Sequence, residues 1–292
     1  MRNPYIGEVY RPPSEATSLI IQSTIGCSQN RCTFCTMYKE KNFTIKPVHQ
    51  VIDQIDEYMN HSRGQYQKIF LADGDALIRP ISEQLEILNH IRTHYPQIER
   101  VSSYGSPRSA LNHSVEDLHL LRKAGLKLIY LGLESGCDEV LSLVQKGVCA
   151  REIVEASRRL HDAGFELSVT AIIGLGGKKN SMEHGKMTGE VLSKIKPEYI
   201  GLLTLMVPKD SLLQESIRSG EFQLLSSEEI LLETKEILLN LDSEGSVFRS
   251  NHASNYLDLR GTLNQDTPRL LQMIDDALLG KRKLKEEIFR GL

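Results

Sequence analysis

The chain has 292 residues, 40% apolar and 25% charged, a composition typical of globular proteins that excludes a disordered or fibrous one. Its net charge of −3 provides no basic field for a nucleic-acid partner, and the absence of any run of eighteen apolar residues argues against a membrane span. Three of the five cysteines lie between residues 27 and 35. In a reducing cytosol this crowding favours a metal site over disulfides. The first residues have no apolar core of the length that a signal peptide needs, so we expect a cytosolic protein.

Short apolar runs alternate with amphipathic stretches along the first two thirds of the chain. The pattern predicts strands at residues 18–24, 68–72, 100–104, 127–133, 166–173 and 199–205, and helices at residues 48–60, 82–94, 115–124, 151–163 and 181–195. Strands that alternate with helices indicate parallel βα units with right-handed crossovers. Six units are too few to close an eight-fold barrel. The predicted fold is therefore α/β, a partial (β/α)6 TIM-like barrel.

The regular alternation of predicted strands and helices ends at about residue 206. Residues 226–241 and 267–279 have helical periodicity, and between them residues 246–256 are predicted to be a short strand that runs into a polar loop. No linker rich in glycine, serine or proline separates this part from the rest. We therefore expect an N-terminal extension (1–16), the partial barrel (17–206) and a C-terminal helical and short-strand cap (207–292) that packs on the barrel.

The three crowded cysteines follow directly on the first predicted strand. Cys27, Cys32 and Cys35 have no fourth cysteine nearby, so they could bind three irons of a cubane and leave the fourth iron open for chemistry. The position also suits an active site, because parallel α/β folds place active sites at the carboxyl ends of their strands. A zinc site made of these thiolates and a histidine is the alternative, since thiolates also bind zinc well.

The cysteine loop resembles the signature of the radical S-adenosylmethionine (SAM) superfamily. The usual spacing in that family is C-x3-C-x2-C, whereas this chain has C-x4-C-x2-C and keeps the closing Cys-Thr-Phe-Cys. The resemblance implies one [4Fe–4S] cluster held by Cys27, Cys32 and Cys35, with SAM at the open iron. It also places Phe34 beside the adenine of SAM.

Two further strand ends carry residues that the resemblance connects with SAM. The family places a glycine-rich, often acidic turn after the second strand, and here that turn contains Gly74 and Asp75. Its carbonyls and carboxylate would attract the methionyl ammonium group, and glycine permits a close approach. Ser103, at the end of the third strand, is a weaker candidate for a SAM contact, and a buried hydroxyl is the alternative.

The fourth and fifth strand ends complete the resemblance. The stretch Leu-Gly-Leu-Glu-Ser-Gly that ends at residue 136 is similar to a motif of the coproporphyrinogen-oxidase-like and methylthiotransferase-like branches. It implies that Glu134 bonds the ribose hydroxyls or the amino-acid end of SAM. Ile172 and Gly174 lie in a segment similar to the family's adenine-binding strand end, where glycines let the backbone approach the ligand.

A dense polar segment lies between the two C-terminal helices. It is either the floor or lid of a substrate pocket or a turn with satisfied hydrogen bonds. As substrate-contact candidates it provides Arg249, Asn251, His252 and Asn255.

The resemblance implies an enzyme that reductively cleaves SAM to a 5′-deoxyadenosyl radical, which then abstracts hydrogen from an unknown substrate. The expected partners are an electron donor such as flavodoxin or ferredoxin and a small-molecule substrate, with no membrane, and the charge disfavours a nucleic acid. The sequence identifies no catalytic side chain. The alternative function is a non-catalytic zinc or iron–sulfur protein with a binding or regulatory role.

Overall fold

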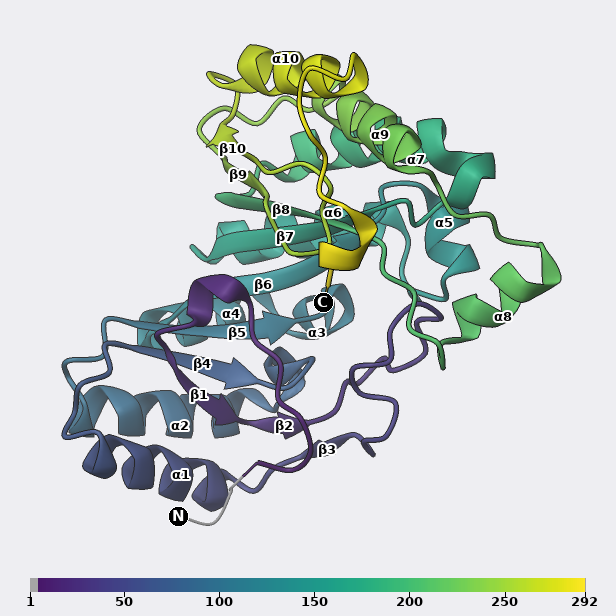
Figure 1. The fold of residues 1–292 in the computed structure, drawn as a ribbon. Helices are drawn as coiled ribbons and strands as arrows, with labels where there is room; N and C mark the ends of the chain where they lie inside the picture. Colours follow the sequence, from purple (N-terminus) through teal and green to yellow (C-terminus); the bar gives the residue numbers. More distant parts are fainter. Residues whose placement is uncertain (1–4, 292) are drawn as a thin grey trace. The chain divides into compact units, whose positions relative to one another are not determined.

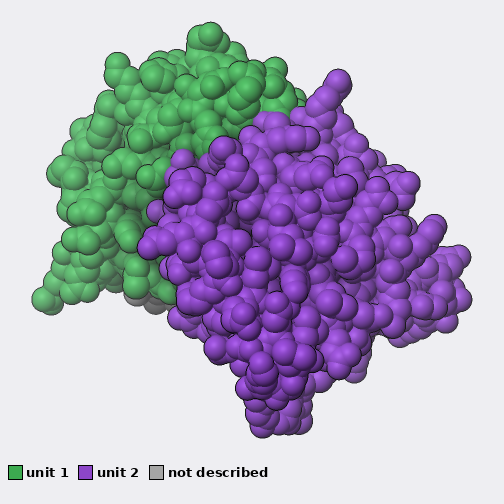
Figure 2. Space-filling view, turned by 90° about the horizontal axis from the view of Figure 1, so that it is seen from above, with its two compact units in different colours: residues 1–30, 37–131, 155–167 green, residues 31–36, 132–154, 168–292 purple. Residues whose placement is uncertain are grey.

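The structure is a computed structural model that describes residues 5–291 (Figure 1). It divides into two compact units, which Figure 2 distinguishes by colour. The first unit consists of the described residues up to 30 together with 37–131 and 155–167. The second consists of residues 31–36, 132–154 and those from 168 onward.

The first unit contains four neighbouring parallel strands, β1 (Leu19–Gln22), β4 (Lys68–Ala72), β5 (Arg100–Gly105) and β6 (Leu126–Glu134), of which β6 contributes residues 126–131. Nearly every residue of β1 and β4 is buried, as expected for parallel strands that are covered on both faces. The parallel register brings the carboxyl ends of these strands to one edge, because parallel strands all point the same way.

Helices α1 (Val48–His61), α2 (Ile81–His94) and α4 (Val115–Ala124) pack side by side in this unit, with α2 in contact with both of the others. The short helices η2 (Ala76–Ile78) and α3 (Pro107–Asn112) follow the ends of β4 and β5. A separate antiparallel pair, β2 (Thr24–Ile25) and β3 (Thr44–Ile45), brackets the segment that carries the three clustered cysteines.

The segment before β1 covers one face of the first unit's strands. On that face Phe70, Tyr104 and Tyr130 form mutual edge-to-face contacts, and Val9 of the N-terminal segment packs against their cluster. Helix η1 (Pro13–Glu15) ends in Glu15, which is fully buried. Its carboxylate accepts hydrogen bonds from Tyr130 Oη at 2.6 Å and Arg100 Nη2 at 2.7 Å, so the N-terminal segment is fixed to β5 and β6.

The second unit contains β7 (Glu166–Ile173, from residue 168 onward), β8 (Tyr199–Thr204), β9 (Val247–Ser250) and β10 (Leu259–Thr262). β7, β8 and β9 are parallel neighbours, and β10 runs antiparallel to β9. The sheet is thus mostly parallel, and its last strand reverses direction through the loop that follows β9.

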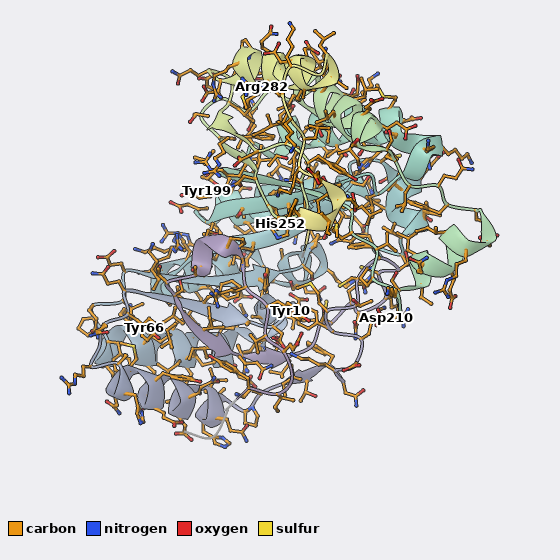
Figure 3. All side chains as sticks on the ribbon, viewed as in Figure 1. Tyr10, Tyr66, Tyr199, Asp210, His252 and Arg282 are labelled. Atoms are coloured by element: carbon orange, nitrogen blue, oxygen red, sulfur yellow. The ribbon has the colours of Figure 1, made fainter. Side chains whose placement is uncertain are left out.

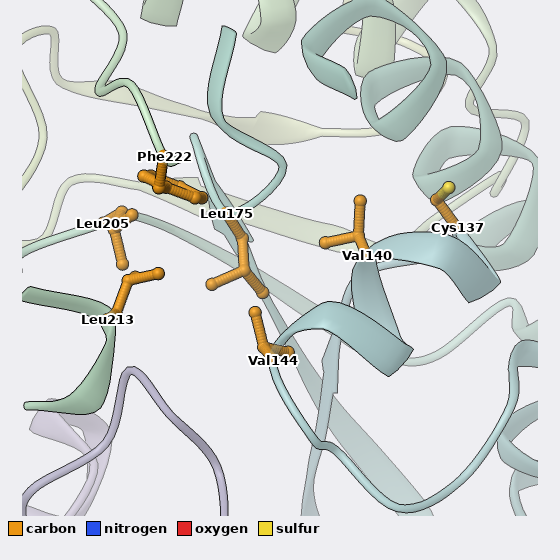
Figure 4. Packing of buried hydrophobic residues seen from close by; sticks show 7 residues of the cluster. All are labelled: Cys137, Val140, Val144, Leu175, Leu205, Leu213 and Phe222. Carbon is orange, nitrogen blue, oxygen red and sulfur yellow. The ribbon is translucent and has the colours of Figure 1, made fainter. Parts of the chain in front are cut away.

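Helix α7 (Gly177–Ile195) packs against α9 (Ser227–Leu239), and α9 packs against α10 (Thr267–Leu278). Helices α5 (Asp138–Leu143) and α8 (Leu212–Ser219) contribute to a hydrophobic cluster that Figure 4 shows. Its buried members are Cys137, Val140, Val144, Leu175, Leu205, Leu213 and Phe222. The remaining elements are α6 (Ala150–Asp162), which has residues in both units, and the 3-10 helix η3 (Glu287–Phe289).

The predicted α/β class with mostly parallel strands is confirmed, as is the alternation of strands and helices up to β8. The sequence reading missed β2, β3, β10, α3, α5 and α8, because elements of two to eight residues are too short to show a hydrophobic period. The division at residues 16 and 206 stays a prediction. Within residues 5–291, no helix combines the length and the apolar character that crossing a bilayer requires.

Candidate functional site

Cys27 lies in the first unit, directly after β2, against the turn that follows β4. The Gly74 N–H donates to the Gly26 carbonyl at 3.1 Å, which ties the two segments together. A Cβ atom on Gly74 would stand 2.9 Å from the Cβ of Cys27 and 2.7 Å from the Tyr38 ring. Only glycine therefore fits at this position, because real Cβ atoms do not approach other atoms so closely.

Asp75, the expected partner of the SAM ammonium, is fully buried and heavily hydrogen-bonded. Its oxygens accept from the hydroxyls of Ser28 at 2.5 Å, Ser106 at 2.9 Å and Ser109 at 2.8 Å, and from the Ser106 N–H at 3.0 Å. These bonds join the cysteine loop, the β4 turn and the N-terminal end of α3. A contact of Asp75 with SAM stays a prediction, and the contacts seen are those of a residue that supports the turn around Gly74.

Ser103 is buried, and its hydroxyl has no hydrogen-bond partner among residues 5–291. In the parallel register it stands beside Leu71 and Ile129, whereas Ser102 stands beside Phe70. Neighbouring strand residues point to opposite faces, so Ser103 lies on the face opposite the aromatic cluster. The role of Ser103 as a SAM contact stays a prediction.

Cys32 and Cys35 lie in the second unit, on the short segment 31–36. Both backbone groups of Thr33 are held: its N–H donates to the Val144 carbonyl at 3.0 Å, and its carbonyl accepts from the Leu213 N–H at 3.0 Å. The loop between these two cysteines is therefore anchored to α8 and to the end of α5. All five cysteines of the chain are thiols, and the three in the loop are partly exposed.

Two of the residues expected to contact adenine pack against the same hydrophobic cluster. Phe34 and Ile172 are both partly buried, and both pack against the hydrophobic cluster shown in Figure 4. One of these side chains comes from the cysteine loop and the other from the end of β7. This shared apolar surface has the character that an aromatic base would need.

Glu134 ends β6 in the left-handed region, with a φ of 63°, which is uncommon for a residue other than glycine. Its carboxylate pairs with Lys146 Nζ at 2.9 Å, and both side chains are mostly buried. Backbone conformations of this kind gather at functional sites, where the surrounding structure holds them. Because a carboxylate accepts several hydrogen bonds, Glu134 could bond a ribose hydroxyl or the amino-acid end of SAM beside Lys146, and this role stays a prediction.

Gly174 is connected to a buried carboxylate that the sequence reading did not identify. Glu233, on α9, accepts from the Gly174 N–H at 2.6 Å and from the Ser181 hydroxyl at 2.5 Å. His184, on α7, lies 3.3 Å from Glu233, donates from Nε2 to the Ile172 carbonyl at 3.1 Å, and bonds Ser135 through Nδ1 at 2.7 Å. These side chains link the ends of β6 and β7 to α7 and α9.

Ser135, His184 and Glu233 form the serine–histidine–carboxylate arrangement of a nucleophilic triad, but all three are fully buried. Burial raises the pKa of Glu233 to about 7 and lowers the pKa of His184 to about 4, because a charge on either group is poorly solvated there. The Nε2–H donated to Ile172 and the Nδ1 acceptor facing Ser135 fit a neutral imidazole. The cluster positions strand ends and offers no nucleophile to a substrate.

Replacing Glu233 by glutamine is expected to make the chain more resistant to alkaline pH. Folding raises the pKa of Glu233 from 4.5 to about 7, so the folded state favours the protonated carboxyl. The wild type therefore has its full stability below pH 4.5 and loses part of it as pH rises from 4.5 through 7. Between pH 5 and pH 8, the unfolding free energy of Glu233→Gln should therefore rise relative to the wild type by about 2 kcal/mol. Urea unfolding of the metal-free proteins at both pH values measures this; a constant difference would contradict it.

The C-terminal candidates take part mainly in internal contacts. Asn255 is buried, accepts from the Thr204 N–H at 2.7 Å and donates to the Leu202 carbonyl at 2.8 Å, so it joins the loop after β9 to β8. His252, labelled in Figure 3, bonds the Ser254 hydroxyl at 3.0 Å. Arg249 donates to the Phe248 and Gly261 carbonyls, and Asn251 is exposed. Their role as substrate contacts stays a prediction.

The residues present suit an iron–sulfur cluster and SAM. No group of three His, Cys, Asp or Glu side chains within residues 5–291 is arranged around a single ion. A cubane differs, because each thiolate binds its own iron. At the end of β4, Asp73 is fully buried, and its Oδ1 has no hydrogen-bond partner among the described residues. An unsatisfied buried carboxylate oxygen beside the cysteine loop is what a cationic or hydrogen-bonding ligand would satisfy.

Comparisons with known proteins identify the family of this chain. A family model described as the radical SAM superfamily matches residues 21–185, more than half of the chain. The 4′-phospho-dehydrooxetanocin synthase of Priestia megaterium is 25% identical over 221 residues, which cover 68% of this chain and 29% of that protein. The tRNA-2-methylthio-N(6)-dimethylallyladenosine synthase of Hahella chejuensis is 24% identical over 182 residues, covering 58% of this chain and 39% of that one.

Among solved structures, coproporphyrinogen III oxidase from Escherichia coli has a similar fold, with a TM-score of 0.57 at 19% identity. The match covers 76% of this chain and 52% of that one. The chain thus spans well under half the length of the two curated relatives, and the likeness to the oxidase concerns the fold alone. The fold is that of a partial, TIM-like radical SAM barrel, and the chain belongs to the radical SAM superfamily.

Proposed function

We propose that this chain is a radical SAM enzyme in which Cys27, Cys32 and Cys35 hold one [4Fe–4S] cluster. When bound, the cluster supplies the electron that cleaves SAM to methionine and a 5′-deoxyadenosyl radical, which abstracts hydrogen from a substrate. The observation that carries the proposal is the family match over residues 21–185, which contains all three thiols and the predicted strand ends.

The chain's own residues would bind and orient SAM. Phe34 and Ile172 offer an apolar surface for adenine, and the backbone at Gly174 is held in place by Glu233. We assign Glu134 to the ribose or the amino-acid end, and the turn at Gly74 to the methionyl group. The buried side chains around these positions would exclude water from the site.

Radical SAM enzymes need a reductant and a substrate. We propose a flavodoxin or ferredoxin as the electron donor and a small molecule as the substrate, with the polar segment 249–255 as one wall of its pocket. The tRNA-modifying relative makes RNA the competing substrate class, although the net charge of −3 does not favour it. A cytosolic location also stays a prediction. A non-catalytic zinc or iron–sulfur protein is not favoured, since the family match is to a superfamily of enzymes.

Anaerobic reconstitution with iron and sulfide tests this function. The expected result is about four irons and four sulfides per chain and, after addition of dithionite and SAM, release of 5′-deoxyadenosine and methionine. Zinc without sulfide in the purified protein, or a loaded cluster that leaves SAM intact, would reject the proposal. Mass spectrometry of both products against a sample without SAM is the measurement.

A further inference from the structure

The segment that carries the three cysteines runs from Gly26 to Lys41, and only its residues 31–36 belong to the second unit. Both of these residues contact the same side chain, Asp73 at the end of β4. Its Oδ2 accepts from the Gly26 N–H at 3.0 Å and from Lys41 Nζ at 2.9 Å. One carboxylate therefore joins the beginning and the end of the cysteine-bearing segment.

Lys41 is placed as a buried structural cation. Its side chain is 8% exposed, and besides Asp73 it donates to the Glu8 carbonyl and lies 5.4 Å from the centre of the Tyr38 ring. Burying an ammonium group is costly unless such partners compensate it. These contacts hold Lys41 just before β3, where the cysteine-bearing segment ends.

Asp73 is equally constrained. It is fully buried, and Gln22 Nε2 donates to the same Oδ2 at 2.9 Å. The neighbouring Gly74 leaves the space that Cys27 occupies. The carboxylate is therefore fixed by β1 and β4, which are among the most buried strands of the unit, and it transmits their rigidity to the loop.

A second connection within the segment is made by Asn30, which lies between Cys27 and Cys32. Asn30 has a φ of 33°, in the left-handed region that asparagine tolerates better than most residues. Its side chain donates to the Tyr38 carbonyl at 2.8 Å, and its own carbonyl accepts from Lys39 Nζ at 2.8 Å. The outgoing and returning branches are thus joined at Asn30 as well as at Asp73.

We propose that Asp73 and Lys41 form a latch that closes the cysteine-bearing segment at its base, and that cluster assembly requires this latch. Both are positioning residues, since they act through the loop and touch no iron. The inference rests on the proposed function, because it assumes that the three thiols hold a cluster. It adds that this chain's four-residue spacing is held by an ion pair outside the cysteine motif.

Cluster content after reconstitution is the test, with activity left aside. Lys41→Met should lower bound iron and sulfide about tenfold, the lower end of the loss seen when outer-shell partners of metal ligands are removed. Lys41→Arg should restore most of the content, because it keeps the charge. Asp73→Asn, which keeps the shape and an acceptor for Gly26, should give an intermediate content and should replace Lys41→Met in the comparison if that variant fails to fold.

Arg100→Met is the matched control. It breaks another ion pair of this unit that has a fully buried partner, Arg100–Glu15 at 2.7 Å, which joins the N-terminal segment to β5. Urea unfolding of the metal-free variants should show comparable destabilisation, while Arg100→Met alone retains wild-type iron content. Equal iron content in Lys41→Met and the wild type would overturn the latch and leave the proposed function intact. A wild type that takes up no iron and sulfide would overturn both.

Discussion

Alanine at any one of Cys27, Cys32 and Cys35 should lower the iron and sulfide bound per chain by more than about tenfold, and SAM cleavage should fall with it. Each thiolate of a three-cysteine cubane binds a different iron, so two cannot replace the third. Absorbance, iron and sulfide analysis and 5′-deoxyadenosine release measure the effect.

The control for this series is Cys149→Ala. The thiol of Cys149 is partly exposed, and its backbone N–H donates to the Glu152 carboxylate at 2.8 Å. Cys149 belongs neither to the cysteine loop nor to the hydrophobic cluster of Figure 4. Its replacement should leave cluster content unchanged. Cys137 would be a poor control because it is buried in the hydrophobic cluster. Full cluster content in all three loop variants would contradict the ligand assignment.

The second large effect is expected for Gly136→Ala, at the end of the Leu-Gly-Leu-Glu-Ser-Gly motif. A Cβ atom there would stand 2.5 Å from the Met187 carbonyl carbon and 2.7 Å from the Thr188 Cα, both of them backbone atoms of α7. Because neither can move without the helix, the variant should lose about 3 kcal/mol of unfolding free energy or fail to fold. Urea unfolding of the metal-free protein measures the loss.

Gly201→Ala is the matched variant, in β8 of the same unit. The nearest atom to its added Cβ is Thr170 Oγ1 at 3.7 Å, an ordinary contact. Its unfolding free energy should therefore change by only about 0.5 kcal/mol. Equal effects of the two substitutions would show that the packing of α7 on Gly136 is looser than the structure has it.

The sequence predicted the elements and residues whose signals are local. The cysteine spacing lies within nine residues, and the strand ends could be recognised because each apolar run precedes a turn with glycine or acid. The adenine candidates Phe34 and Ile172 both pack against one hydrophobic cluster, and their contact with adenine stays a prediction. Patterns of this kind lie within a short window of sequence, so they can be recognised without knowledge of the fold.

Residues that act across long sequence separations could not be predicted. Asp73 meets Lys41 only because β4 runs beside β1, and Glu233 reaches Gly174 from a helix almost sixty residues further along the chain. The face of Ser103 depends on strand register, which shifts between Val101 and Ser102 where β5 pairs with β6. A shift of one residue reverses which side chains face a ligand, and no sequence pattern here reports it.

The N-terminal segment also determines from which side solvent can approach the first unit. Val9 and the buried Glu15 carboxylate lie against the ring face formed by Phe70, Tyr104 and Tyr130. Glu15 forms an ion pair with Arg100 at the amino end of β5, so the N-terminal segment itself covers this face of the strands. The carboxyl ends of the strands, where parallel α/β folds place their active sites, are therefore where we expect a ligand of this unit to bind.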